Sequence, residues 1–451
     1  MDVALIARVL WMRRALRSRE RWSAERLAAH RAGQLELLRR HAFARSPFYR
    51  RFHHGLEMKP LHELPILTKT ELMSNFDELV TDRAVRLADV RAHLQELKRD
   101  EAFLDRYRVT RTAGSTGNPG IFLSDAREWA SIIASYSRAQ EWAGVIPHLT
   151  SRTRLAVVSS RVPSHQSARV SASVDAPFLP VRRFDSTEPL EAIVLGLNAW
   201  QPVNLIAYAS MARILAEEQL AGRLQISPKV VMSASEVLTP ESRGRIWRAW
   251  GREPFDVYAA TETATIASEC SIRRLHLFED LVITEVVDER NRSTPPGEFG
   301  AKLLVTVLFS RTQPLIRYEI SDRVMLAAER CACGLPFALL SGIEGRAEDI
   351  LRLPSQEGGV VAIHPNVFHN LLERLPVQAW QVLEEPDAIR ILLSRPSGDI
   401  DVERLTSNVA SALQQRGAVG RPVRIERVES VIKTTLGKAP LVKAWRSPQS
   451  V

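Results

Sequence analysis

Cysteine is scarce in this chain, which has three cysteines among its 451 residues. So few thiols exclude the disulfide framework that stabilises many small secreted proteins. Long apolar runs are also missing, because no segment reaches the roughly 18 uninterrupted apolar residues of a membrane-spanning helix. The first apolar run, over 3–12, contains Arg8 and lacks a clear cleavage site, so we expect no signal peptide. We therefore expect a cytoplasmic protein with no membrane partner.

Lysine is the second scarce residue, since only eight of the 61 basic residues are lysines. The net charge of +9 points toward an anionic partner such as nucleic acid. The charge is diffuse, however, and no clustered Lys/Arg face with interleaved aromatic residues is found, so we expect no nucleic-acid partner. The densest basic stretch alternates with apolar residues and predicts one face of a helix that carries Arg13, Arg14, Arg17, Arg19 and Arg21.

The chain is longer than the size at which one hydrophobic core stops growing, so we expect at least two domains. Hydrophobic residues make up 45% and charged residues 25% of the chain, as in ordinary globular proteins. Helical apolar spacing extends from residue 1 to about 45, ends at Ser46-Pro47, and returns over 83–103. Thr68, three residues before Glu71, predicts a capping box at a helix start.

Short apolar runs typical of buried strands alternate with helix-like stretches in the middle of the chain. This alternation predicts an α/β fold with parallel strands. The strand-like runs are 155–158, 203–208, 229–232 and 255–258, and the helix-like stretches are 127–142, 211–220 and 240–250.

The sequence becomes β-rich after about residue 276, with strands expected over 281–287 and 302–307. A boundary near 340–350 is followed by helix- and strand-like runs that are long enough for a small α+β domain. We therefore predict a large N-terminal domain over 1–344 and a small C-terminal domain over 345–451.

A loop rich in glycine and hydroxyl residues, RTAGSTGNPG, occupies residues 111–120. Its glycines allow close backbone approach to a ligand, and its backbone N–H groups and hydroxyls suit a polyphosphate. The loop is not a Walker A motif, because the Gly-Lys-Ser/Thr segment is missing. By itself such a run is also compatible with an ordinary loop.

Four further segments follow in a fixed order: YAATET (258–263), PLIRY (314–318) before Ser321-Asp322, GIEGR (342–346) before Glu348-Asp349, and TTLGK (434–438). Together with the loop, this order resembles the adenylate-forming superfamily of acyl-CoA ligases, in particular the phenylacetate-CoA ligase family. The resemblance extends from about residue 35 to 440 and includes HAF (41–43), SPFYR (46–50), LPILTK (64–69) and HLFED (276–280).

The resemblance implies an enzyme that joins a carboxylic acid to AMP from ATP, releases pyrophosphate and forms an acyl-CoA thioester. It implies ATP, Mg²⁺ and coenzyme A as ligands, a large AMP-binding domain and a small mobile lid. The alternative is transfer of the acyl group to a carrier protein or an amine. The resemblance also implies an aromatic acid, such as phenylacetate, benzoate or anthranilate, and the small Ala259 and Ala260 leave room beside Tyr258 for a flat ring. A homodimer is also expected.

The resemblance also assigns roles to individual residues. Lys438, Thr261 and Glu262 would be catalytic: Lys438 would neutralise charge at the acyl carboxylate and the α-phosphate, Thr261 would bind phosphate, and Glu262 would hold Mg²⁺. The nucleotide would be bound by Thr112, Gly114, Ser115, Thr116, Gly117, Ser235, Glu236, Tyr258, Ala259, Asp322 and Arg346. Tyr258 would lie near the adenine, and Asp322 would accept hydrogen bonds from the ribose.

Each assignment has a simpler alternative, since Glu262 also suits an exposed loop, Asp322 a turn, and Lys438 a solvated surface. The chain also departs from the family pattern. Asn118 stands where lysine is frequent, Ala113 where a small hydroxyl or glycine is usual, and Glu348 where aspartate is frequent.

Three cysteines and a histidine form two close pairs in the sequence, Cys270 with His276 and Cys331 with Cys333. Three thiolates and one imidazole make the tetrahedral ligand set of a structural Zn²⁺ site, in which no open position remains for catalysis. Three buried thiols are the alternative. The turn-like sequence CACG (331–334) disfavours a core strand, and some members of the family carry a similar cluster. We therefore predict a zinc site.

Overall fold

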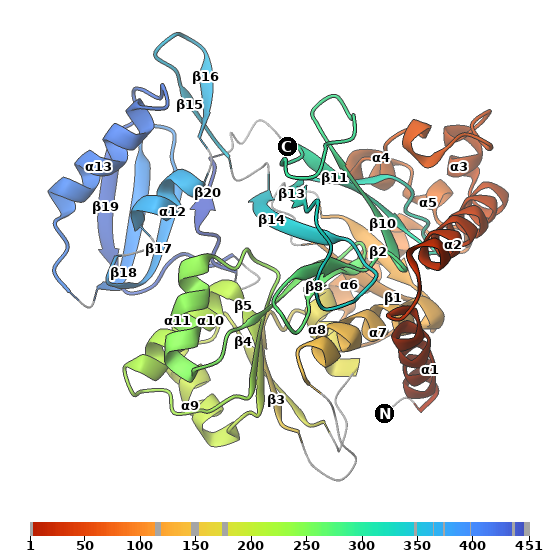
Figure 1. Ribbon diagram of the computed structural model, residues 1–451, viewed down its shortest axis with the longest axis horizontal. Coiled ribbons are helices and arrows are strands. Elements are labelled where there is room, and N and C mark those ends of the chain that lie inside the picture. The colour runs from red at the N-terminus through yellow and green to blue at the C-terminus, as the bar shows by residue number, and fades with distance from the viewer. Residues whose placement is uncertain are drawn as a thin grey trace. The chain divides into compact units, whose positions relative to one another are not determined.

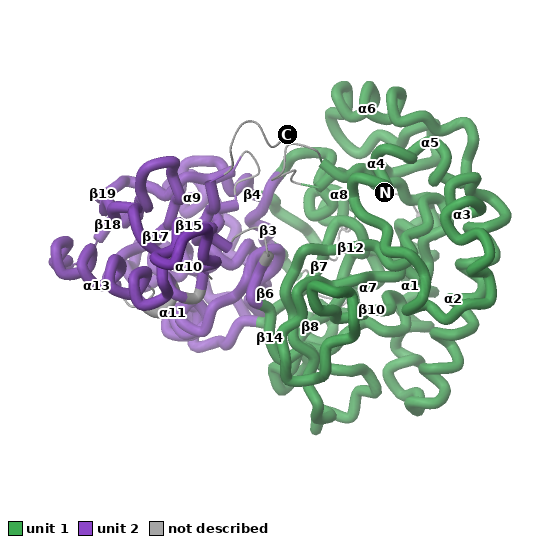
Figure 2. Tube along the Cα trace, turned by 90° about the horizontal axis from the view of Figure 1, so that it is seen from above, with its two compact units in different colours: residues 1–155, 161–183, 255–343 green, residues 156–160, 184–254, 344–451 purple. Residues whose placement is uncertain are grey.

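The computed structural model folds the chain into helices and mixed sheets that form two compact units (Figures 1 and 2). Unit 1 contains residues 1–155, 161–183 and 255–343, and unit 2 contains 156–160, 184–254 and 344–451. The structure describes residues 3–112, 119–145, 153–173, 179–346, 350–363, 365–372, 375–396, 398–434 and 438–445.

Unit 1 begins with helices whose ends follow the predicted capping signals. Ser46 accepts a hydrogen bond from the backbone N–H of Tyr49, and Pro47 is the first helical residue after it, so Ser46-Pro47 ends one helix and starts the next. The capping box of Thr68 and Glu71 is present. The helices are α1 (Val3–Arg19), α2 (Ala24–Arg45), α3 (Pro47–Phe52), η1 (Leu61–Glu63), α4 (Lys69–Ser74), α5 (Phe76–Leu79), α6 (Leu87–Glu96), α7 (Ala126–Trp142) and α8 (Gln166–Ser173).

Two helical predictions were wrong in part. The helix expected over 83–103 is α6 alone, because Leu97 has an extended backbone and the backbone N–H of Arg99 bonds the carboxylate of Glu101 instead of a helical carbonyl. The arginines near the N-terminus do not share one helix face. Arg13 is buried and pairs with Glu141, and Arg19 pairs with Asp280, whereas Arg14, Arg17 and Arg21 are exposed.

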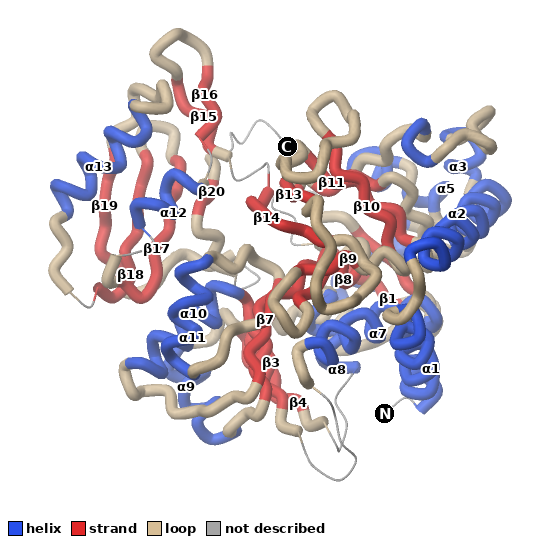
Figure 3. The backbone as a smooth tube through the Cα atoms, viewed as in Figure 1, coloured by secondary structure: helices blue, strands red, loops and turns tan. Residues whose placement is uncertain are grey.

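The strands of unit 1 bring distant segments together (Figure 3). Antiparallel β1 (Arg108–Arg111) and β2 (Ile121–Ser124) flank the glycine–hydroxyl loop. The order β13-β14-β9-β8-β7 joins strands from the β-rich part of the chain, and a three-stranded antiparallel sheet has the order β10-β11-β12. These strands are β7 (Phe255–Ala260), β8 (Ala264–Glu269), β9 (Leu275–Leu277), β10 (Val282–Val287), β11 (Lys302–Val307), β12 (Tyr318–Ile320), β13 (Asp322–Leu326) and β14 (Leu339–Arg346).

The first part of unit 2 has the predicted alternation of strands and helices. Strands β5 (Asn204–Tyr208) and β6 (Val230–Ala234) pair in parallel, and β3 (Leu155–Ser159) lies beside β5. Their buried side chains share one core with those of α9 (Leu190–Trp200), α10 (Ala209–Leu220) and α11 (Pro240–Trp250). Strand β4 (Val181–Asp185) completes the elements between residues 150 and 254. The predicted α/β class is therefore confirmed.

The C-terminal part of unit 2 is a separate α+β layer with its own core around fully buried Trp380. Its main sheet has the order β19-β18-β17-β20, and α12 and α13 pack beside it (Figure 1). It also contacts the first part of unit 2, where the Gln378 amide donates to Glu218 over 2.7 Å. Its elements are β15 (Leu351–Pro354), β16 (Val360–Ile363), α12 (Asn366–Leu372), β17 (Val377–Glu384), β18 (Ile389–Pro396), α13 (Val402–Gln414), β19 (Val423–Val428) and β20 (Val442–Lys443).

The two compact units do not test the predicted domain boundaries at 344 and 345, which stay a prediction. Within the described residues, no helix combines the length and the apolar character that crossing a membrane requires.

Candidate functional site

Hydrogen bonds between Thr112 and Gly120 join the two ends of the glycine–hydroxyl loop. The Thr112 hydroxyl accepts from the backbone N–H of Gly120 over 2.8 Å, and the Thr112 N–H donates to the Gly120 carbonyl over 2.9 Å. These two bonds continue the β1–β2 ladder into the loop and hold its ends together. The predicted phosphate-binding residues Gly114, Ser115, Thr116 and Gly117 lie outside the described residues.

Tyr258 and Asp322 are brought together by adjacent parts of unit 1, although 64 residues separate them. The Tyr258 phenol donates to Oδ2 of Asp322 over 2.6 Å, and each side chain is only 9% exposed. Tyr258 lies on β7, and Asp322 is the first residue of β13. The β7–β8 register shifts between Tyr258 and Ala259, so Ala259 and Ala260 follow the tyrosine at an irregular strand end.

Thr261 and Glu262 lie in the tight turn between β7 and β8. The carbonyl of Thr261 accepts from the side-chain amide of Gln166 over 3.1 Å, and Gln166 accepts from the Tyr136 hydroxyl over 2.8 Å. The turn is therefore fixed by side chains from α7 and α8. Both turn residues line a hollow of about 20 Å³ whose other lining residues are a mixture of apolar and polar ones: Phe122, Leu123, Ser124, Glu128, Ile132, Val307, Phe309, Ser310, Gln313 and Leu315.

Glu128 is the second carboxylate of this hollow, and its contacts give it a structural role. It accepts hydrogen bonds from the backbone N–H groups of Asp125 and Thr312, each over 2.7 Å. Burial raises the pKa of Glu128, and Asp125 adds to the rise. Its oxygens hold a helix start and a loop.

In unit 2, the structure brings Lys438 to the predicted segment Ser235-Glu236. The Lys438 ammonium donates to the Ser235 carbonyl over 3.2 Å and lies 5.5 Å from the ring centre of Tyr208. Ser235 has a positive φ of 69°, a conformation that costs energy in a residue other than glycine and is frequent at functional sites.

The Glu236 carboxylate links this segment to the chain around Lys438. It accepts from the backbone N–H of Ser210 over 2.8 Å and from that of Ala439 over 3.2 Å. Burial raises the pKa of Glu236, while the Ser210 hydrogen bonds and the Lys438 charge oppose the rise. Glu236 is therefore an anchor for the end of the TTLGK segment.

The sequence analysis did not identify a second lysine, Lys433, which lies five residues before Lys438. Lys433 is half-buried, and its ammonium donates to the carbonyl of Ser186 over 2.5 Å. Burial lowers the pKa of Lys433, and Asp185 and Glu236 act against that effect. The signal that was available is the rarity of lysine, since three of the eight lysines, Lys433, Lys438 and Lys443, follow one another at intervals of five residues. Arg346 ends β14, and its side chain lies outside the description.

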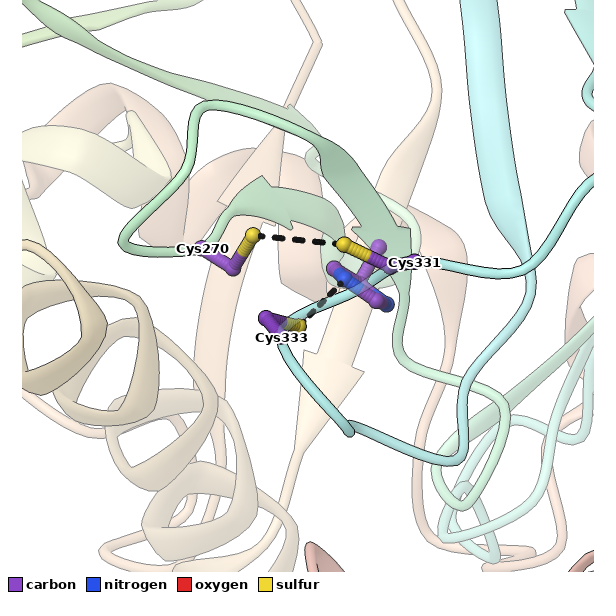
Figure 4. A group of neighbouring side chains, drawn as sticks. Cys270, Cys331 and Cys333 are labelled. Atoms are coloured by element: carbon purple, nitrogen blue, oxygen red, sulfur yellow. Dashed lines mark hydrogen bonds between the residues drawn. The ribbon is translucent and has the colours of Figure 1, made fainter.

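The four predicted metal ligands converge in unit 1 (Figure 4). Their ligand atoms all lie within 4.8 Å of one another, with 3.8 Å between the sulfurs of Cys270 and Cys331 and 3.3 Å between Cys333 Sγ and His276 Nε2. The His276 Nδ1 contacts the Phe337 carbonyl over 3.0 Å, which fixes the ring and leaves Nε2 directed at the thiols. Burial raises the pKa of Cys333 to about 12, and the neighbouring thiols add to the rise.

The HLFED segment contributes both a cluster ligand, His276, and a buried ion pair. Arg138 on α7 donates two hydrogen bonds to Asp280, over 2.8 and 2.7 Å, and both side chains are fully buried. Burial by itself raises the pKa of Asp280, but the positive charges of Arg138 and Arg19 lower it below its ordinary value. Asp280 therefore has a structural role in unit 1, where it binds Arg138 of α7.

No protein-family model matches the chain. Over 458 residues it is 24% identical to the phenylacetate-coenzyme A ligase of Thermus thermophilus, with 94% of each chain covered. The structure of a 2-hydroxyisobutyryl-CoA ligase in the postadenylation state superposes with a TM-score of 0.73 at 20% identity, covering 96% of this chain and 92% of that one. An anthranilate CoA ligase bound to anthranoyl-AMP gives a TM-score of 0.51 at 19% identity, over 73% and 64%.

These likenesses identify the fold as that of adenylate-forming acyl-CoA ligases. The predicted resemblance to the adenylate-forming superfamily is therefore confirmed, and the similarity to a phenylacetate-coenzyme A ligase extends over nearly the whole chain.

Proposed function

We propose that the protein is an ATP-dependent, AMP-forming acid–CoA ligase. The observation that carries the proposal is the placement of Lys438 at Ser235-Glu236, because this gives a charged amino group a defined position on a segment that the resemblance assigns to the nucleotide site. Tyr258 and Asp322 supply a buried, hydrogen-bonded pair in unit 1 that suits the adenosine. Full-length similarity to a phenylacetate-coenzyme A ligase supports the same function.

In the first proposed step, an oxygen of the substrate carboxylate bonds to the α-phosphorus of ATP, and the bond to pyrophosphate breaks. Two anions must approach each other, so fixed positive charge lowers the barrier, and Lys438 would supply it. In the second step, the sulfur of coenzyme A bonds to the acyl carbon, AMP leaves and the thiol proton passes to solvent. Glu262 has the hard oxygen donors that Mg²⁺ prefers, and the ion would neutralise phosphate charge.

For the substrate, we propose an aromatic acid, mainly because the chain resembles the phenylacetate-CoA ligase family. The small side chains of Ala259 and Ala260 agree with a flat ring. A carrier protein or amine as acyl acceptor, in place of coenzyme A, is the second candidate, and a homodimer and a cytoplasmic location also stay predictions.

The test is release of pyrophosphate from ATP in the presence of a panel of aromatic and aliphatic acids, with and without coenzyme A. We expect release with an aromatic acid and formation of its thioester when coenzyme A is added. Release without thioester would favour the carrier-protein alternative. Absence of release with every acid, in folded protein, would contradict the enzyme proposal.

We also propose that Cys270, His276, Cys331 and Cys333 hold a structural Zn²⁺. The donor set fits, because three sulfurs and one oriented imidazole nitrogen converge. The ion would stabilise the thiolates, which burial and mutual repulsion otherwise disfavour. Cys331 and Cys333 lie in an irregular segment that contains Gly334 at φ +83°, and shared ligation would fix that segment to β9.

A further inference from the structure

The exposed face of α1 carries two large apolar side chains that nothing in the described structure covers. Leu10 is 65% and Trp11 70% exposed, whereas Leu5 and Leu16 on the opposite face are buried. Figure 1 shows α1 at the edge of unit 1, with α7 on one side of it. The solvent face of α1 is therefore accessible over the whole helix.

Arginines surround these apolar side chains. The segment 3–19 contains five arginines and no acidic residue, and the exposed Arg14 and Arg17 follow Leu10 and Trp11 on the same face. Among the nearby acids, Glu141 on α7 is paired with Arg13 and Arg17, Glu20 is paired with Arg138, and Glu25 is exposed in the first turn of α2.

A hollow of about 370 Å³ extends this face beyond the end of α1. Positions 10, 11, 14, 17 and 18 of α1 have the spacing of one helix face, and three of them, Arg14, Arg17 and Ser18, also line the hollow. Arg26 stacks over the Trp22 ring at 4.6 Å on its inner side. The lining residues are Arg14, Arg17, Ser18, Arg21, Trp22 and Arg26.

We propose that this face docks the protein on an anionic lipid bilayer. Leu10 and Trp11 would enter the interface between headgroups and acyl chains, and Arg14 and Arg21 would contact lipid phosphates. Exposed apolar and aromatic side chains beside arginines suit an anionic bilayer surface, because the arginines meet lipid phosphates while the apolar groups leave water. At 17 residues with five arginines, α1 would lie on the membrane and not cross it.

Two other occupants fit the face less well. A second copy related by two-fold symmetry would place the same arginines against each other, which is electrostatically unfavourable. A polynucleotide would satisfy the arginines but would leave the aliphatic Leu10 without a role, since nucleic acids offer phosphates and ring faces. This inference goes beyond the proposed ligase activity and does not depend on it, because none of these residues belongs to the candidate site.

The test is flotation of the full-length protein with vesicles of phosphatidylcholine alone, or with a quarter of the lipid replaced by phosphatidylglycerol. We expect partitioning at least about tenfold higher on the anionic vesicles, because each arginine near such a surface contributes roughly fivefold. The double variant Arg14→Glu/Arg21→Glu and the variant Trp11→Ala should each lose most of this binding.

The matched control variants make the same types of substitution at exposed positions away from α1. Arg252→Glu alters an exposed arginine, and Trp247→Ala removes a tryptophan that is 56% exposed on α11; both should bind vesicles like the parent. Equal binding to both vesicle types, or unchanged binding of the α1 variants, would overturn the proposal. So would a dimer in size-exclusion chromatography that Trp11→Ala dissociates, or tighter binding to a single-stranded oligonucleotide than to anionic vesicles.

Discussion

The phenol of Tyr258 donates a 2.6 Å hydrogen bond to Oδ2 of Asp322, and this bond joins a strand end of the YAATET segment to the start of β13. Tyr258→Phe keeps the ring but removes the donor. We expect the KM for ATP to rise about tenfold with a smaller change in kcat, because Asp322 would lose its orientation toward a ribose. The free energy of unfolding should fall by about 1–3 kcal/mol, the cost of an unsatisfied buried acceptor.

Tyr49→Phe is the matched control for this variant. The Tyr49 hydroxyl is also buried and donates to the Pro314 carbonyl over 2.9 Å. A similar loss of stability without a rise in the KM for ATP is expected. If both variants raise this KM equally, Tyr258 acts only through stability.

Lys438→Ala tests the assignment of the adenylation charge. Pyrophosphate release should fall by at least about 10³-fold, the range for loss of one electrostatic stabiliser in a site. Conversion of supplied acyl-AMP and coenzyme A to thioester should remain near that of the parent, because Lys438 has no role in the second step. Lys443→Ala, an exposed lysine on β20, is the control and should affect neither reaction. Equal loss of both steps would argue against a lid that uses Lys438 only for adenylation.

The local patterns in the sequence predicted the elements well, because capping and apolar periodicity act over a few residues. The capping box at Thr68 and the parallel pair β5–β6 are examples. The C-terminal part was predicted from helix- and strand-like runs without bounds for its individual elements, and the roles of the chemical segments came from the resemblance to a family.

Contacts between distant residues set the limit of sequence reasoning. Arg13 and Arg19 turn inward to form ion pairs with Glu141 and Asp280. These two acids lie far along the chain, so local periodicity could not distinguish the inward arginines from the exposed Arg14. Lys433 was not identified for the same reason. Its partner is the backbone carbonyl of Ser186, and because every residue has a backbone carbonyl, the residue types in the sequence do not reveal this contact. The metal cluster was the exception, because cysteine is rare enough for its members to be matched by chemistry alone.

The buried pair of Arg138 and Asp280 predicts a dependence of stability on pH. Because the two arginines lower the pKa of Asp280, its stabilising contribution is fully present above the unfolded value of about 4 and is lost as pH falls through the folded value. Asp280→Asn should cost about 3–5 kcal/mol at neutral pH, because it leaves the buried Arg138 charge uncompensated. Urea unfolding of both proteins between neutral and acid pH should show this difference shrinking only in the acid range.

Asp288→Asn is the control for that measurement, since Asp288 forms an exposed ion pair with Arg292. Its effect on the free energy of unfolding should be much smaller than that of Asp280→Asn, because solvent screens an exposed pair. A loss at Asp280 as small as the loss at Asp288 would show that the Arg138–Asp280 pair does not stabilise unit 1.

The metal cluster predicts bound zinc whose loss destabilises unit 1. Protein purified without chelators should contain about one zinc per chain by elemental analysis, and Cys333→Ser should reduce this severalfold while lowering Tm, because three ligands remain of a four-ligand set. His276→Ala should behave in the same way, whereas His54→Ala, an exposed histidine on another part of unit 1, should keep both zinc and Tm. A strong chelator should release the ion and expose three titratable thiols together. Zinc-free parent protein with an unchanged Tm in chelator would leave Cys270, Cys331 and Cys333 as packed thiols, and the irregular segment around Gly334 would then have to be held by the Phe337–His276 contact and its neighbours alone.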